Sequence, residues 1–177
     1  DFTRISELNG IFVYDIQEDY SGNLWIATYA NGVYYLDKST KRWNQFVHNK
    51  NNPHSLPNDK VLSILEDSKK RLWFTTQGGG FCQYDENNKQ FIRYDSKSLS
   101  IPSNIVFNII EDNTGIFWVT TNNGLLSFNP ETLATKIYTV SSGLLSNQFN
   151  YQSGYKDDSG KIYAGSINGF IGFDPAQ

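Results

Sequence analysis

The chain has 177 residues, of which 15% are aromatic and 19% are charged, and its formal net charge at pH 7 is −3. Lysine and arginine cluster only at Lys69-Lys70-Arg71, so the basic stripe that nucleic-acid binding requires is missing. No apolar run approaches the roughly 20 residues that span a bilayer, which predicts that this segment makes no membrane contact. The aromatic content and the 14 glycines favour short strands joined by turns.

In chain order, the sequence opens with a short segment, Phe2–Ile5, that resembles the last strand of the units after it. Three similar units follow over residues 11–47, 61–94 and 105–139, and a fourth over residues 149–173 lacks a last strand. We therefore expect the segment at residues 2–5 to complete the fourth unit.

Each unit is predicted to contain four strands, because its segments are short, rich in β-branched and aromatic residues, and interrupted by glycine and asparagine. In the second unit these strands are expected at Val61–Glu66, Leu72–Thr76, Gly80–Tyr84 and Gln90–Tyr94. The second strand is apolar on both faces, which predicts that a neighbouring sheet covers each face.

One motif recurs at a fixed register in all four units. An aspartate precedes a tryptophan by six positions in the first three units, and a tyrosine takes the tryptophan position in the fourth. These anchor residues are Trp25, Trp73, Trp118 and Tyr163, and they are spaced by 48, 45 and 45 residues. A recurring aromatic residue on a strand covered on both faces indicates packing between sheets.

A period in the mid-forties with four strands per unit is typical of β-propeller blades. The sequence predicts an all-β protein of four four-stranded antiparallel blades, which we interpret as a fragment of a larger, seven-bladed propeller. Two alternatives remain open: the chain closes as a four-bladed ring, or two copies each supply half of a ring. As a fragment, it is expected to contact the remaining blades and downstream domains of a parent chain, and to self-associate in isolation.

The sequence indicates neither a metal site nor a cofactor site. A single cysteine, Cys82, lies in an apolar strand and is expected to be a buried free thiol, and neither His48 nor His54 lies near it in sequence. The recurring Glu-Asp pairs lie at the turn after the first strand of three units, where a structural role explains them better than acid–base catalysis. No catalytic residues are predicted.

Ligand binding is expected where the loops between the second and third strands meet the connections between units, because propeller loops converge there. Asparagine and glutamine both donate and accept hydrogen bonds, which suits sugar hydroxyls, and a tyrosine ring can stack on a sugar face. The candidate binding residues are Tyr29, Asn31, Gln77, Asn122, Asn123, Asn168, His54, Asn58, Asn104 and Asn147. Asparagine is also a common turn residue, so a structural role is the alternative interpretation of these positions.

The motif resembles the two-component regulator propeller repeat, Ile-x-Glu-Asp-x-x-Gly-x-Leu-Trp-Ile-x-Thr, which runs here from Ile16 to Thr28 and recurs from Ile64 and Ile109. The end of the chain, from Gly143 to Phe173, resembles the end of the second propeller in Bacteroides-type hybrid two-component histidine kinases. This resemblance implies a periplasmic, non-catalytic sensor region that responds to oligosaccharides from glycans, in a signalling protein anchored in the inner membrane. Tyr163 departs from the repeat and suggests a terminal blade.

Two hypotheses for function follow. The first is a sensor module that binds an oligosaccharide and is not itself an enzyme, although the parent protein would be a kinase. The alternative is a scaffold fragment whose ligand contacts lie on missing blades or on partner domains. A propeller-borne hydrolase or lyase ranks third, because the sequence shows no convergent acid–base pair.

Overall fold

The computed structural model describes residue 2 and residues 4–177, which form four antiparallel sheets in chain order. Blade 1 contains β1 (Val13–Glu18), β2 (Leu24–Thr28), β3 (Val33–Leu36) and β4 (Trp43–Phe46). Blade 2 contains β5 (Val61–Glu66), β6 (Leu72–Thr76), β7 (Phe81–Asp85) and β8 (Gln90–Tyr94). Blade 3 contains β9 (Val106–Glu111), β10 (Phe117–Thr121), β11 (Gly124–Phe128) and β12 (Thr135–Tyr138), and blade 4 contains β13 (Phe149–Lys156), β14 (Ile162–Ser166) and β15 (Gly169–Phe173).

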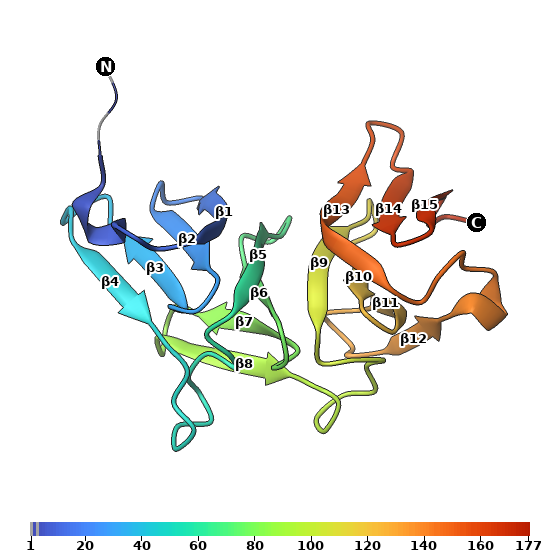
Figure 1. The fold of residues 1–177 in the computed structure, drawn as a ribbon, viewed down its shortest axis with the longest axis horizontal. Helices are drawn as coiled ribbons and strands as arrows, with labels where there is room; N and C mark the ends of the chain where they lie inside the picture. The colour runs from blue at the N-terminus through green and yellow to red at the C-terminus, as the bar shows by residue number, and fades with distance from the viewer. Residues whose placement is uncertain (1, 3) are drawn as a thin grey trace.

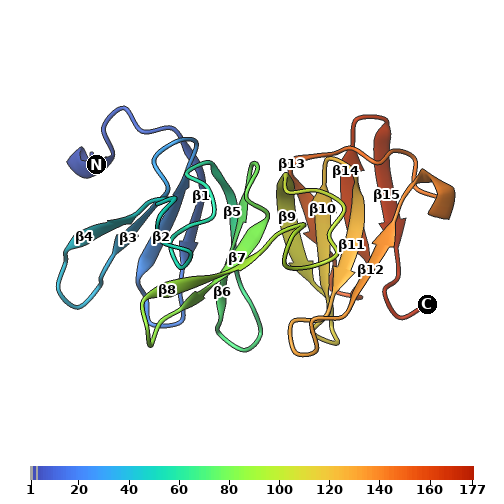
Figure 2. The ribbon, with the colours of Figure 1, turned by 90° about the horizontal axis from the view of Figure 1, so that it is seen from below.

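The four sheets are propeller blades arranged along an arc (Figure 1), and they stand next to one another in chain order (Figure 2). The first strands of the blades, β1, β5, β9 and β13, lie on the inside of this arc. Two short 3-10 helices, η1 (Ser6–Leu8) and η2 (Val140–Ser142), lie outside the sheets. The predicted all-β fold of antiparallel propeller blades is confirmed, except that the described part of blade 4 has three strands instead of four. The strands predicted for the second unit agree with β5 to β8 to within one residue.

The second strand of each blade forms the centre of the core. All five residues of β6 and all five of β10 are buried, because another blade covers each face of these two sheets. This burial explains the apolar runs that the sequence shows at these positions. Cys82 is fully buried in the core between blades 1 and 2, which confirms the expected buried free thiol, and this burial raises the pKa of the thiol.

Each tryptophan anchor packs on the blade that follows it in the chain. The ring centroids lie 5.0 Å apart for Trp25 and Tyr84, and 4.9 Å apart for Trp73 and Phe117. Trp118 lies 4.6 Å from Phe173 in the same manner. The anchors are therefore packing residues, as predicted, and every interface between blades carries one.

The recurring aspartate accepts a hydrogen bond from the side chain of the anchor residue. In the first three blades the indole Nε1 donates to the Asp Oδ2 at distances of 2.8, 2.9 and 3.0 Å. In blade 4 the Tyr163 hydroxyl donates to Asp157 over a longer 3.4 Å. The same carboxylates also accept backbone N–H groups of their own turns, so one side chain stabilises both the turn and the anchor.

The turn between the first two strands requires a residue with positive φ near its end. Glycine supplies it in three blades, at Gly22, Gly115 and Gly160, with φ between 80° and 91°. Blade 2 places Lys70 there with a φ of 67°. The Lys70 N–H donates a hydrogen bond to the Asp67 carbonyl and closes this turn. The stability of the closed turn offsets the modest energetic cost of the left-handed backbone conformation at Lys70.

The predicted completion of blade 4 by residues 2–5 is not observed. Phe2, Arg4 and Ile5 lie outside any strand, while Thr3 lies outside the described residues, and the described part of blade 4 has three strands. The helix η1 and β15 lie at opposite ends of the arc (Figure 1), so the two segments are too far apart to pair. The fourth blade is thus a β13-β14-β15 sheet.

We expect Asp67→Ala to lower the free energy of unfolding by about 3 kcal/mol, because it leaves the buried Trp73 N–H and the Arg71 guanidinium without their shared acceptor. The matched change Asp157→Ala is expected to cost much less, since Tyr163 is only half-buried and its bond is longer. Urea denaturation of the two variants measures the difference, and equal losses would contradict the proposed role of the aspartate.

We expect stability to fall in acid because of carboxylates such as Asp112. Burial acts to raise the pKa of Asp112, but hydrogen bonds from Thr114, Trp118 and Ile116 hold it below its ordinary value of 3.8. Because the pKa of Asp112 is lower in the folded state than in the unfolded state, its ionised carboxylate stabilises the fold above pH 3.8. This stabilisation is lost as the pH falls through the folded-state pKa. Urea denaturation between about pH 5 and pH 2 tests this. The variant Asp112→Asn should show a shallower decline, and an unchanged slope would refute the assignment.

Candidate ligand-binding face

The turn between the second and third strands meets the connection between blades at one face of the arc, as predicted. The first residue of each turn donates its backbone N–H to a carbonyl in the same blade. The acceptor is the residue directly before the first strand of that blade. These four pairs are Tyr29 with Phe12, Gln77 with Lys60, Asn122 with Ile105 and Ile167 with Gln148, at 2.9 to 3.3 Å. We call the surface formed by these eight residues the channel-mouth face.

A β-bulge near the start of each inner strand directs a side chain towards the middle of the arc. The register shifts between Val13 and Asp15 in β1, and equivalent shifts occur in β5 and β9. The residues at these bulges are Tyr14, Leu62 and Phe107. Bulges commonly redirect a side chain in this way.

The bulge in β13 is larger and brings blade 4 across to the first two blades. The irregularity spans Phe149 to Gly154, and Gln152 within it has a φ of 50°. The Gln152 Nε2 donates to the carbonyl of Leu62 at 2.8 Å and to that of Tyr14 at 3.3 Å. A non-glycine residue with positive φ is uncommon in a strand, and here these two contacts hold it in place.

Five aromatic rings gather where the bulges meet the channel-mouth face. Tyr14 lies 5.5 Å from Phe12, 5.9 Å from Tyr29 and 6.1 Å from Tyr151, where the two rings stack. Tyr151 in turn lies 4.8 Å from the buried Phe107. The exposed fractions of Phe12, Tyr29 and Tyr151 are 67%, 42% and 44%, so the rings present an open apolar surface. We call these five residues the channel-mouth cluster.

The cluster has polar groups beside its rings. The Lys60 ammonium lies 4.9 Å from the centre of the Tyr29 ring, in cation–π contact. Burial raises the pKa of Tyr14 above its ordinary value, and the neighbouring Tyr151 and Tyr29 raise it further. The buried Oδ1 of Asn122 has no hydrogen-bond partner among the described residues. The face therefore combines ring surfaces with a lysine ammonium group and one amide oxygen that has no partner among the described residues.

Three of the predicted binding residues occupy this face: Tyr29, Gln77 and Asn122. Three others are bonded within the connections between blades. The Oδ1 of Asn104 accepts the N–H of Ser96, that of Asn147 accepts the N–H of Val140, and that of Asn58 accepts the N–H of Lys60. These asparagines shape the loops, which is the structural role that the sequence analysis left open for them.

The remaining predicted residues lie apart from the cluster. The backbone carbonyl of His54 accepts the N–H of Phe91, so the loop carrying His54 lies along the outer strand β8 rather than at the mouth. The Arg93 guanidinium holds this loop with hydrogen bonds to Asn52, Ser55 and Leu56. Asn31, Asn123 and Asn168 lie further along their turns, where their backbone N–H groups bond to the threonine or serine that ends the second strand, and no hydrogen bond among the described residues joins them to the rings.

Phe12, Tyr14, Tyr151 and Lys60 were missed by the sequence analysis. Their positions follow from the bulges, because a regular strand would send Tyr14 and Tyr151 to other surroundings. The available signal was a cluster of aromatic residues close to the start of the first and last inner strands. Tyr29, which the sequence did single out, lies at the centre of the set.

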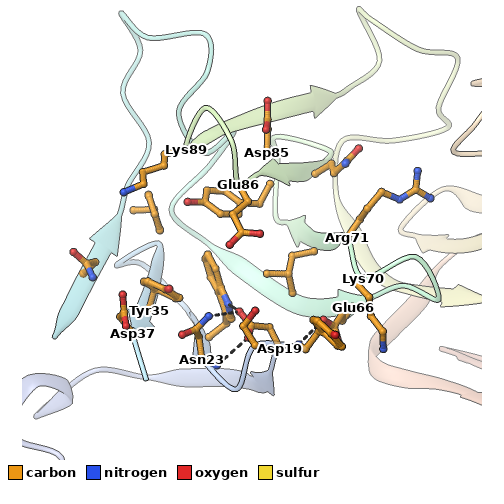
Figure 3. A pocket seen from close by; sticks show the side chains of 18 of the residues that line it. Asp19, Asn23, Tyr35, Asp37, Glu66, Lys70, Arg71, Asp85, Glu86 and Lys89 are labelled. Atoms are coloured by element: carbon orange, nitrogen blue, oxygen red, sulfur yellow. Dashed lines mark hydrogen bonds between the residues drawn. The ribbon is translucent and has the colours of Figure 1, made fainter. Parts of the chain in front are cut away.

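A cleft lies between blades 1 and 2 on the opposite side from the channel-mouth face, at the turns between first and second strands (Figure 3). This cleft has a volume of about 660 Å³, and Tyr35, Phe46 and Tyr84 line it around the buried Trp25. The Asp19 and Glu66 carboxylates are occupied by the turn at its edge, as the dashed lines in Figure 3 show. None of the predicted binding residues lines this cleft.

The described residues contain neither a metal-binding cluster nor a membrane-spanning helix. No cluster of three or more histidine, cysteine, aspartate or glutamate side chains suited to a metal ion occurs in residue 2 and residues 4–177. In the same part of the chain, no helix has the length and apolar character needed to cross a membrane.

Comparison with known proteins supports the motif assignment. Residues 7–30, 55–78 and 100–123 match the family model described as a two-component regulator propeller. Histidine kinase P4 of Formosa agariphila is 24% identical over 224 residues, and the match covers 97% of this chain and 16% of that protein.

Solved structures show the same fold. The extracellular domain of a proposed hybrid two-component system from B. thetaiotaomicron has a TM-score of 0.75 at 22% identity, covering 92% of this chain and 23% of that chain. A second such domain from the same organism has a TM-score of 0.66 at 22% identity, covering 99% of this chain and 29% of that one. The chain spans less than a third of each relative. Three segments of the chain therefore match the two-component regulator propeller model, and the solved structures show that the chain shares their propeller fold.

Proposed function

We propose that the chain is a ligand-binding part of the extracytoplasmic input region of a two-component signalling protein, and that its channel-mouth face binds an oligosaccharide. The channel-mouth cluster carries this proposal. It places exposed aromatic rings beside amide and hydroxyl groups, which is the combination that binds the apolar face and the hydroxyls of a sugar.

The signalling role is supported by the relatives, since one is a histidine kinase and two are extracellular domains of proposed hybrid two-component systems. In such a protein the chain itself would bind and the kinase would lie elsewhere. The arrangement of the inner strands suits a sensor, because Gln152 joins blade 4 to blades 1 and 2 beneath the cluster. A ligand on the rings would therefore contact residues from both ends of the arc.

We expect Tyr29→Ala to weaken oligosaccharide binding at least about tenfold, or about 1.4 kcal/mol, because it removes a ring from the centre of the cluster. The matched control is Tyr20→Ala, which removes an exposed tyrosine at the opposite turn and should leave the affinity unchanged. Titration calorimetry with a panel of glycan-derived oligosaccharides measures both. No binding by any member of the panel, or equal loss in the two variants, would refute the proposal.

A further inference from the structure

The residue four positions after the recurring aspartate places a positive charge on the anchor ring in two of the four blades. In blade 2 the Arg71 guanidinium lies 5.5 Å from the centre of the Trp73 ring. In blade 4 the Lys161 ammonium lies 5.4 Å from the centre of the Tyr163 ring. Both distances are in the range of cation–π contact. Blade 1 has Asn23 at this position, which carries no charge.

The Arg71 guanidinium also joins blade 2 to blade 3. Its Nε donates to Asp67 at 2.6 Å, and its Nη1 forms an ion pair at 2.9 Å with Glu131, in the turn between β11 and β12. The group therefore lies on an aromatic ring, between a carboxylate of its own blade and a carboxylate of the next blade. Ring stacking and paired carboxylates are the contacts that suit a planar guanidinium group.

The interface between blades 1 and 2 has no such group and opens into the cleft of about 660 Å³ (Figure 3). Asn23 lines this cleft but stays on its own blade. Its Nδ2 donates to Asp19 at 3.0 Å, and its Oδ1 accepts the N–H of Lys38 at 3.0 Å. Where a guanidinium group joins blades 2 and 3, blades 1 and 2 therefore leave an open cleft.

The walls of the cleft offer aromatic rings from both blades. Tyr35, Phe46 and Tyr84 are only partly buried, and their ring centroids lie 4.5, 5.9 and 5.0 Å from that of Trp25. Tyr35 pairs with Trp25 across β2 and β3, at the position that Gln83 takes beside the anchor of blade 2. Blade 1 thus has an additional ring next to its anchor, and ring faces attract cations.

A carboxylate extends into the cleft from the turn between β7 and β8. This residue is Glu86, whose side chain points into the middle of the cleft in Figure 3. Burial raises the pKa of Tyr35 and that of Tyr84, the latter to about 12, and nearby carboxylates, Glu86 among them, raise both further. The region around the two hydroxyl groups is therefore electronegative.

The basic side chains at the rim leave this carboxylate free. Among residue 2 and residues 4–177, no ion pair involves Glu86. The three basic side chains that Figure 3 labels turn their charged ends away from it. The basic residues that line the cleft are Arg42, Lys70, Arg71 and Lys89.

We propose that the cleft between blades 1 and 2 binds the guanidinium group of a ligand, which lies against the rings of Tyr35 and Tyr84 and pairs with Glu86. Arg71, on Trp73 and beside Glu131, is the precedent for this arrangement within the chain. Both blades that form the cleft are complete four-stranded sheets. The cleft lies opposite the channel-mouth face, so this inference does not depend on oligosaccharide binding there.

Titration calorimetry of the whole chain with N-acetyl-arginine methylamide tests the proposal, because the guanidinium is the only charge on this capped arginine. We expect a dissociation constant of about 1 mM or lower, from a cation–π contact and a charge-assisted hydrogen bond. The capped citrulline has nearly the same shape without the charge and should bind at least tenfold more weakly. Agmatine distinguishes the source: it should bind as tightly as capped arginine if a free guanidinium compound is the ligand, and more weakly if the ligand is an arginine of a peptide.

Three variants assign the binding to the cleft. Glu86→Gln should weaken the binding of capped arginine at least tenfold, whereas Glu18→Gln makes the same change at an exposed glutamate outside the cleft and should have no effect. Asn23→Arg gives blade 1 the residue that blade 2 has, and it should abolish binding because its own guanidinium takes the site. Urea denaturation of each variant verifies that the fold is kept.

Four results would overturn the proposal. The first is capped citrulline binding as tightly as capped arginine, and the second is an equal affinity of Glu86→Gln and Glu18→Gln for capped arginine. The third is undiminished binding by the folded Asn23→Arg variant. The fourth is displacement of capped arginine by a neutral oligosaccharide, which would make the cleft a sugar site.

Discussion

The hydrogen bond from the anchor indole to the recurring aspartate is the contact on which the rest of the structure depends. The tryptophan must enter the interface between blades, where burial of its polar N–H without a partner would be costly. The aspartate supplies the acceptor and at the same time caps the turn that precedes the strand. The local turn and the long-range core are therefore fixed by one carboxylate, which explains why both residues recur at a constant separation.

Much of the fold was predictable because the information that specifies it is local and repeated. The separation of six positions from Asp67 to Trp73 located the turn, and the apolar run after it located β6. The sequence could not show that the indole donates to that aspartate, because the bond depends on how the side chain turns within the sheet. Lys70 likewise gave no signal, since the turn tolerates lysine only through the hydrogen bonds around it.

The candidate site was predicted less well, for a physical reason. Choosing the face required only the order of the strands, and Tyr29 followed from it. Tyr14 and Tyr151 reach the same place because extra residues in β1 and β13 break the two-residue alternation, and such bulges leave little trace in a single sequence. The asparagines were ambiguous throughout, because an amide that shapes a loop and one that meets a ligand occupy similar turns. Only the contacts of Asn104 and Asn147 separate the two roles.

The loop that carries His54 has a consequence for solubility. The last strand of each blade has one free edge, and unpaired backbone groups along an edge are a template for strand addition by another chain. The loop occupies part of this edge on β8, where Phe91 donates to the His54 carbonyl and Arg93 fixes the loop in position. The connection between blades 1 and 2 therefore covers part of the outer edge of β8 and blocks the addition of a strand from another chain there.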